Sequence, residues 1–471
     1  MPNSSLPQLK VKTTRVVPSP DADVQQQEAL IQTLLLTVQH FFGGFSRLFG
    51  PVPDPRHPMY ITYPLVALIT AGVLLFLFRL AARRQVGHLL RGNGPSAAKF
   101  QALFGVDNFP HGDTLNVAFA RFNVAEVQEV VTSMTETLIR RKVLYPYRLF
   151  EHYFLVAIDG TGMLVFAQRH CAHCLTLTTK EGKTIYYHPV LEAKLVTPNG
   201  FAFSLMTEFI ENPGQQPTKQ DCELKAFYRL AKRLKQRFPR LPICLSLDGL
   251  FAGGPTFTLC EEYHWKYIIV LQEDDIPYIN EEFKALIQLT PENHRRFYTG
   301  PRSATQQDFQ WVNDIVYEDT QHKEHTLAVV QCLESVPQAA GSRQTTRFKW
   351  VTNFAVTGRN VITLANQGGR LRWKIENEGF NTQKNGGFAL EHAYSKDPVA
   401  SKVFYFLLQV AHLLSQLIEK GSLFRQAFPA GVGSAKNIAF RLLEAWRNLR
   451  LSLEQIQGML TVSVQIRFDT S

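Results

Sequence analysis

The stretch FEHYFLVAIDG, residues 150–160, decides the fold class, because the sequence changes there from helical to strand-like patterning. An apolar run of this length, bounded by turn residues, predicts a buried β-strand. A second run of the same kind, LPICLSLDG at residues 241–249, also ends in Asp-Gly. Reactive groups in α/β sheets gather beyond the carboxyl ends of the strands. Asp159 and Asp248 are therefore the first candidate functional residues.

The segments between these two runs predict the rest of the fold. Residues 162–197 have the pattern of a hairpin with its turn at EGK (181–183), and residues 200–210 continue the β character. Residues 222–238 have apolar side chains at helical spacing, with lysine and arginine on the other face. The order strands, helix, strand predicts an α/β fold with a mixed sheet and flanking helices.

The composition excludes a disordered chain and favours an anionic partner. Of 471 residues, 45% are hydrophobic and 11% aromatic, which is enough for a large buried core. Lys and Arg outnumber Asp and Glu by 50 to 40, so the formal net charge is +10. This excess favours nucleic acid or an anionic membrane as partner, although a basic protein without such a partner has the same balance.

The cysteines and the first residues indicate the compartment. Six cysteines in so long a chain do not form a disulfide framework. The first 25 residues are polar and rich in proline, unlike a secretory signal. We therefore expect a cytoplasmic protein.

An apolar run from Leu65 to Phe78 raises the question of a membrane anchor. It has 14 residues, whereas a spanning helix needs about 20. Pro64 precedes the run and suits a helix start better than a helix interior. We expect a buried core helix and no membrane partner; a membrane-anchored protein is the rival interpretation.

The remaining segments differ in pattern and predict separate domains. Gly- and Pro-rich breaks separate helical patterns in the first third of the chain, and a later region is rich in β-branched and aromatic runs. The predicted organisation is a flexible leader (1–25), a helical domain suited to DNA binding (26–145), a central α/β domain in two pieces (146–262 and 358–420), a β-rich insertion domain (263–357) and a C-terminal helical tail (421–471).

The stretch RLRWKIENEGFNTQK, residues 370–384, supplies the third acidic candidate. On an α-helix, Arg372 and Glu376 lie within about 40° of the same face, whereas Glu378 lies on roughly the opposite side. Glu376 is therefore the predicted third carboxylate, and the Glu-His pair at residues 391–392 is the fallback. The rival interpretation is an exposed salt bridge between residues i and i+4.

Three carboxylates from two strand ends and one helix can hold divalent metal ions. Magnesium prefers oxygen ligands, and two ions about 3.5–4 Å apart are a common device in phosphodiester chemistry. One ion lowers the pKa of an attacking water or 3′-hydroxyl, and the other stabilises the leaving oxygen. The predicted cofactor is therefore two Mg²⁺ or Mn²⁺ ions held by Asp159, Asp248 and Glu376.

These residues resemble those of bacterial insertion-sequence transposases of the Asp-Asp-Glu (DDE) type, which have a ribonuclease H-like fold. The resemblance is to the group with a β-rich domain inserted between the second Asp and the Glu. It rests on the order of three strands, a helix and a strand, on the β-rich gap of 128 residues between Asp248 and Glu376, and on RWKIEN, which contains the Arg-x-x-x-Glu core of the family's signature helix. It covers roughly residues 100–420.

The resemblance implies a function, a partner and a set of contacts. Such an enzyme binds the terminal inverted repeats of its mobile element, cuts the DNA there and joins the exposed 3′-hydroxyls to target DNA. The two pieces of the central domain would then form a ribonuclease H-like catalytic domain. Arg372, Lys374 and Lys384 would contact DNA, and the protein would act as a homodimer on DNA in the nucleoid.

Two positions depart from the family pattern. Gly369 stands where the family usually has a tyrosine, and Gln383 stands where it usually has a lysine, with Lys384 one step later. Both positions grip DNA phosphate in the family. The alternatives are a ribonuclease H-like nuclease without strand transfer and a non-catalytic DNA-binding derivative of a transposase. Intact acids at all three positions favour an enzyme.

The stretch HCAHC contains a lone Cys-x-x-Cys pair, Cys171 and Cys174. Together with His188 the pair could bind a structural zinc ion, with His173 or Cys222 as the fourth ligand. One pair without a second at the usual spacing is weak support for zinc. The alternative is a set of hairpin residues packed beside the sheet.

Two further features have both a DNA-binding and a structural interpretation. The cations of residues 225–237 could track a DNA backbone or form a solvated helix face. Trp311 and Trp350 could stack on an unpaired base or belong to the core.

Overall fold

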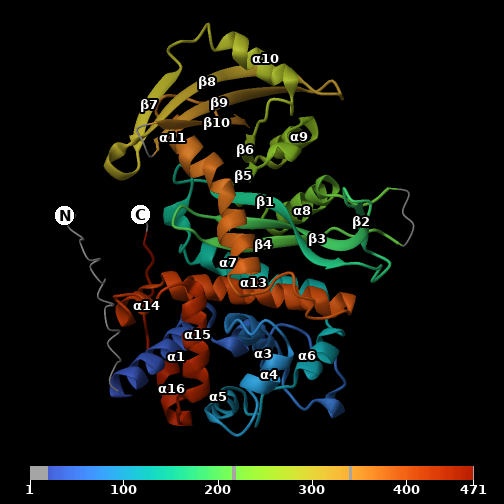
Figure 1. Ribbon diagram of the computed structural model, residues 1–471, viewed down its shortest axis with the longest axis vertical. Coiled ribbons are helices and arrows are strands. Elements are labelled where there is room, and N and C mark those ends of the chain that lie inside the picture. The colour runs from blue at the N-terminus through green and yellow to red at the C-terminus, as the bar shows by residue number, and fades with distance from the viewer. Residues whose placement is uncertain (1–19, 215–218, 339–341, 470–471) are drawn as a thin grey trace, which may run out of the picture.

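The computed structural model describes residues 20–214, 219–338 and 342–469 (Figure 1). Along its long axis lie a strand-rich part, a central sheet with flanking helices, and a helical part that contains the N-terminal helices and the end of the chain (Figure 1). The predicted α/β class, with a mixed sheet, flanking helices and a helical N-terminal part, is confirmed. Of the predicted leader, residues 20–25 lie in a helix, and residues 1–19 lie outside the described residues.

The N-terminal part consists of helices separated by Gly- and Pro-containing turns. They are α1 (Pro20–Phe42), α2 (Phe45–Phe49), η1 (Pro58–Tyr60), α3 (Leu65–Leu77), α4 (Arg84–Leu89), α5 (Pro95–Phe104), α6 (Gly112–Phe119), α7 (Val124–Arg140) and η2 (Tyr145–Tyr147). The apolar run forms α3, and eleven of its thirteen residues are buried. The expectation of a buried core helix for this segment is confirmed.

The central part holds the two strands on which the fold prediction rested, now β1 and β5. Its elements are β1 (Phe154–Phe166), β2 (Leu175–Thr178), β3 (Thr184–Val196), β4 (Ala202–Phe209), α8 (Glu223–Arg237), β5 (Ile243–Leu247), η3 (Gly249–Phe251), α9 (Gly254–Tyr263) and β6 (Lys266–Val270). The predicted hairpin is confirmed as β2 and β3, and the predicted helix as α8. β5 pairs in parallel with both β1 and β6, and β1, β3 and β4 pair antiparallel.

The β-rich segment extends the central sheet instead of forming a separate sheet. Its elements are α10 (Pro277–Leu286), β7 (His294–Thr299), η4 (Pro301–Ser303), β8 (Thr305–Glu318), β9 (Glu324–Pro337) and β10 (Arg343–Thr352). The ten strands have the order β2-β3-β1-β5-β6-β10-β9-β8-β7, with β4 on β3. β6 lies within the predicted insertion (263–357) but belongs to the central sheet, and β10 pairs with its free edge. An uncovered edge strand at this position would leave its backbone groups unpaired.

The last part of the chain returns to helices. Its elements are α11 (Val361–Thr363), η6 (Leu364–Gly368), η7 (Gly369–Arg372), η8 (Ile375–Asn381), α12 (Thr382–Asn385), α13 (Pro398–Lys420), α14 (Ser422–Ala427), α15 (Ala435–Asn448) and α16 (Leu453–Thr461). Within the described residues, α13 is the one helix long and apolar enough to cross a membrane, and 89% of its most apolar stretch is buried. It lies between the central sheet and the helical part (Figure 1), where it packs on α3. α14, α15 and α16 pack against α1, so both ends of the described chain meet there.

Candidate active site

Asp159 and Asp248 lie at the same level of two neighbouring parallel strands. β1 and β5 pair in parallel up to Ala157 and Ser246, and each aspartate follows two residues later. Asp248 directly follows β5, as predicted. The prediction that the first strand ends at Asp159 is wrong, because the other edge of β1 continues to pair with β3, where Asp159 stands opposite Glu192.

The guanidinium of Arg372 connects the third acid to the first. Its Nη1 atom lies 2.9 Å from Oε1 of Glu376 and 3.5 Å from Oδ2 of Asp159. The Arg372 side chain is 8% exposed, and its Nε atom is buried with no hydrogen-bond partner among the described residues. The i,i+4 ion pair of the rival interpretation therefore forms, but its arginine is buried and also reaches Asp159. Glu378 pairs instead with Lys374, at 2.5 Å.

The segment that carries Arg372 is an irregular helix and not the regular α-helix that we predicted. Its π-helical segments η6 and η8 flank the 3-10 segment η7. Gly368 and Gly369 lie so close to Ile268 of β6 and Trp350 of β10 that a Cβ atom at either glycine would overlap with these side chains. Packing on the sheet therefore sets the local helix geometry. It also leaves no room for a tyrosine at Gly369.

Burial raises the pKa of both aspartates. The pKa of Asp159 rises to about 7, mainly because of burial; Glu376 and Asp248 add to the rise, and Arg372 opposes it. The pKa of Asp248 is also raised by burial, with further contributions from Asp275 and Glu376, and again Arg372 opposes the rise. The negative charge of Glu376 raises the pKa of both aspartates, so the three carboxylates are electrostatically coupled.

Two further carboxylates, which we did not predict, border this site. Glu223, the first residue of α8, lies against Gly160, where a Cβ atom would overlap with the carboxylate. Burial and the charge of Asp248 raise the pKa of Glu223. Asp275 lies in the same way against Gly249. The sequence signal for these two carboxylates was the glycine after each aspartate. Because glycine has no Cβ atom, a further carboxylate can lie against the backbone there.

A buried polar network holds the irregular helix on the sheet. Lys194 of β3 forms an ion pair of 3.2 Å with Glu192, and both side chains are fully buried. The Lys194 ammonium also donates to Gln409 of α13, at 2.8 Å, and Gln383 donates to the same amide oxygen, at 2.8 Å. Gln383, at the family's lysine position, therefore anchors the helix and is buried away from solvent.

The two lysines among the predicted DNA contacts remain partly accessible. Lys374 is held by the ion pair within its own helix, and Lys384 pairs with Glu391 at 2.9 Å. Each lysine side chain is 28% exposed. Both ion pairs therefore lie at the surface of the molecule.

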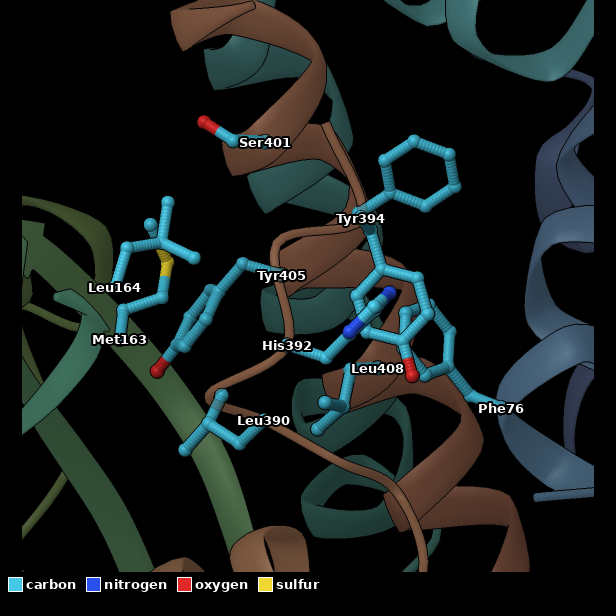
Figure 2. Close-up of a pocket in the computed structure, with 10 residues that line it drawn as sticks. Phe76, Met163, Leu164, Leu390, His392, Tyr394, Ser401, Tyr405 and Leu408 are labelled. Atoms are coloured by element: carbon cyan, nitrogen blue, oxygen red, sulfur yellow. The ribbon is translucent and has the colours of Figure 1, made fainter. Parts of the chain in front are cut away.

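The fallback pair at residues 391–392 has other partners. Its glutamate forms the ion pair with Lys384. Its histidine packs edge-on against Tyr394, with ring centroids 4.8 Å apart. Figure 2 shows this histidine among apolar side chains that come from β1, α3 and α13. Of the glutamates we considered, Glu376 is the one that Arg372 joins to Asp159.

One tryptophan is exposed beside the acidic residues. Trp373 is 50% exposed, and the Arg372 guanidinium lies 4.8 Å from the centroid of its ring. The idea that Trp311 and Trp350 stack on a base is wrong, because both are buried in the core between the sheet and the irregular helix. The aromatic ring exposed beside the acidic residues is therefore that of Trp373, which we did not predict.

The arginines of α8 are largely occupied by ion pairs. Arg229 lies 2.7 Å from both Glu208 and Asp221, and Arg237 bridges to two glutamates of α7. These contacts tie α8 to its neighbours, and they neutralise much of the face that we considered for DNA.

The structure offers two kinds of metal ligand in separate places. The pKa values of Asp159 and Asp248 stay raised although Arg372 opposes the rise, and carboxylate oxygens are the donors that suit a hard divalent cation. Elsewhere, one group of described sulfur and nitrogen ligands has all its ligand atoms within 4.8 Å of one another: His170, Cys171, Cys174 and His188. His170, and not the expected His173 or Cys222, lies with Cys171, Cys174 and His188. His173 instead bonds to the carbonyl oxygen of Asn212, and Cys222 is exposed at the start of α8.

No family model matches the chain, and no curated protein matches it.

Proposed function

We propose that this protein is a transposase of the DDE type, which cuts DNA at the ends of a mobile element and joins those ends to target DNA. The observation that carries the proposal is the convergence of Asp159, Asp248 and Glu376, from two parallel strands and a helix far along the chain, around one buried arginine. Several acids that converge on one site outweigh any single motif.

The strand order supports a ribonuclease H-like core. In that core an antiparallel three-stranded meander is followed by a helix and two parallel strands. The order β4-β3-β1-β5-β6, with α8 before β5, has this arrangement. The β-rich extension separates Asp248 from Glu376, as in the transposase group that the sequence resembles.

The carboxylates Asp159, Asp248 and Glu376 would hold two Mg²⁺ or Mn²⁺ ions. Bound there, the ions would activate a water or a 3′-hydroxyl and stabilise the leaving oxygen. Arg372 keeps Glu376 directed at Asp159 and lies close enough to neutralise a phosphate. Lys374 and Lys384 would exchange their glutamate partners for DNA phosphates.

The net charge of +10 supports a DNA partner. We assign the helical part, including the predicted DNA-binding segment (26–145), to the terminal inverted repeats. Catalysis on paired ends would require a homodimer on DNA, in the cytoplasm at the nucleoid.

The test is metal-dependent cleavage of DNA that carries the sequences flanking the gene in its genome. We expect the wild type to nick and join this DNA with Mg²⁺ or Mn²⁺. Asp159→Asn, Asp248→Asn and Glu376→Gln should each lose at least about a thousandfold in rate while still binding the DNA. Glu378→Gln is the matched control, because it lies on the same helix and pairs with Lys374, and it should retain activity.

The other outcomes separate the alternatives. Cleavage without joining identifies a ribonuclease H-like nuclease. Binding without cleavage identifies a non-catalytic DNA-binding derivative. If Glu376→Gln cleaves as well as the wild type, the assignment of the third acid is wrong.

A further inference from the structure

The loop between β1 and β2 brings together four metal-binding side chains. His170, Cys171 and Cys174 lie in this loop, and His188 lies on β3 opposite Leu164 of β1. Their ligand atoms all lie within 4.8 Å of one another. Cys174 and His188 are buried, and the other two are partly buried, so the ligands converge beneath the surface.

Three of the separations between these side chains are close to the edges of a zinc tetrahedron. With Zn–S bonds of about 2.3 Å and Zn–N bonds of about 2.0–2.1 Å, tetrahedral geometry places two sulfurs about 3.8 Å apart and a sulfur and a nitrogen about 3.6 Å apart. The two sulfurs of Cys171 and Cys174 are 3.6 Å apart. Nε2 of His188 lies 3.4 Å from the first sulfur and 3.2 Å from the second. A disulfide would require about 2.05 Å between the sulfurs.

The ring of His170 gives independent support for a bound metal ion. Its Nδ1 atom is buried and has no hydrogen-bond partner among the described residues. Its ring stacks on Phe166, with centroids 4.5 Å apart, and stands perpendicular to the His188 ring. A buried imidazole nitrogen with no hydrogen-bond partner destabilises a fold. A metal ion at this place would account for the orientation of the ring.

The surrounding backbone supports thiolates and holds the loop in place. The N–H of His173 donates to Sγ of Cys171, and the N–H of Cys171 donates to Sγ of Cys174, both at 3.4 Å. Asn212 donates its side-chain N–H to the carbonyl oxygen of Cys174 and accepts at its own carbonyl from the ring of His173, both at 2.9 Å. Such outer contacts orient the direct ligands of a metal.

We propose that His170, Cys171, Cys174 and His188 bind one structural Zn²⁺ ion. Two thiol and two imidazole ligands in a tetrahedron suit zinc, and four protein ligands leave no open coordination position. Binding releases the two thiol protons to solvent, with no change of oxidation state. The ion fastens the β1–β2 loop to β3.

This site is distinct from the acidic one. His188 lies four residues before Glu192, the residue opposite Asp159, which is about 13 Å along a strand. The zinc proposal therefore does not depend on the transposase proposal, and its test needs no DNA.

The test is the metal content of the tag-free full-length protein, purified in reductant and passed through metal-free buffer. We expect about one zinc per chain, and X-ray absorption should report two sulfur and two nitrogen neighbours. Replacement of zinc by Co²⁺ should give the visible bands of tetrahedral cobalt and a sulfur-to-cobalt charge-transfer band.

Matched variants locate the ion. Cys171→Ser and Cys174→Ser should each lose at least about tenfold in zinc affinity. Cys222→Ser replaces an exposed thiol outside the site, and His173→Asn keeps a donor for Asn212, so both should retain the metal. The proposal is overturned if the wild type contains clearly less than one zinc per chain. It is also overturned if Cys171→Ser contains as much zinc as the wild type. If the serine variants do not fold, the spectrum of the cobalt-substituted wild type still tests the proposal, because it shows whether sulfur ligands bind the metal.

Discussion

At the scale of single residues, the electrostatics of Asp159 dominate the candidate site. Its carboxylate is held between an arginine and two other acids, and its pKa is raised from 3.8 to about 7. The folded state therefore binds a proton here more tightly than the unfolded state. The stability that Asp159 contributes is fully present below its ordinary pKa of 3.8, and it is lost as the pH rises through about 7.

We predict that Asp159→Asn stabilises the metal-free protein at pH 8 and not at pH 3.5. A shift of about three pKa units corresponds to at most about 4 kcal/mol, so a gain of about 2–4 kcal/mol is expected. The measurement is the urea unfolding midpoint in EDTA at a series of pH values. Mg²⁺ should stabilise the wild type above pH 7 but not the variant.

The control for this prediction is Asp113→Asn, whose carboxylate belongs to a side chain that is 80% exposed. It should leave the pH dependence unchanged. The raised pKa predicts that the urea midpoint of the wild type decreases, relative to that of Asp159→Asn, as the pH rises from 4 to 7. A midpoint that stays constant over this range contradicts the raised pKa.

At the scale of elements, the site depends on how closely α8 approaches β1. Glu223 at the start of α8 occupies the space that a Cβ atom at Gly160 would take. Two residues further along the same strand, a Cβ atom at Gly162 meets nothing within 4 Å. The two glycines therefore form a matched pair in one strand.

We predict that Gly160→Ala destabilises the protein by about 1–3 kcal/mol, because the new methyl group pushes the Glu223 carboxylate away. Gly162→Ala should stay within about 0.5 kcal/mol of the wild type. Unfolding midpoints at pH 7 measure both. Equal effects of the two substitutions would show that the approach of α8 to β1 is not tight.

At the scale of the whole molecule, α13 joins the sheet to the helical part. It packs on α3 at Gly72, where a Cβ atom would meet Leu407 at 2.5 Å and Phe119 at 3.1 Å. Leu407 and Phe119 are buried, so neither can move into solvent. The contact between the two layers therefore requires a residue without a side chain.

We predict that Gly72→Leu costs about 2 kcal/mol or more, because overpacking exceeds the gain of about 1 kcal/mol in helix propensity. Gly458→Leu in α16 is the control: a Cβ atom there meets nothing within 4 Å, so it should be neutral or stabilising. Thermal unfolding and limited proteolysis between α7 and β1 measure the loss. An unchanged Gly72→Leu protein would mean that α3 and α13 can separate freely.

The sequence by itself determined the local elements and the acidic residues. Apolar runs and helical spacing predicted β1, β5, α8 and the buried α3, because local periodicity records which side of an element faces the core. The Asp-Gly pairs and the Arg-x-x-x-Glu spacing pointed to Asp159, Asp248 and Glu376, although the enzymatic role of these residues stays a prediction.

Only the tertiary structure decided which distant groups meet. Local spacing does not record how strands pair or how closely helices pack. The β-rich segment is continuous with the central sheet. The predicted α-helix is divided into π and 3-10 segments where Gly368 and Gly369 pack on the sheet. The two further carboxylates, Glu223 and Asp275, and the approach of His188 to the cysteine pair follow from contacts between segments. Long-range packing brought these groups together, and packing depends on the whole chain.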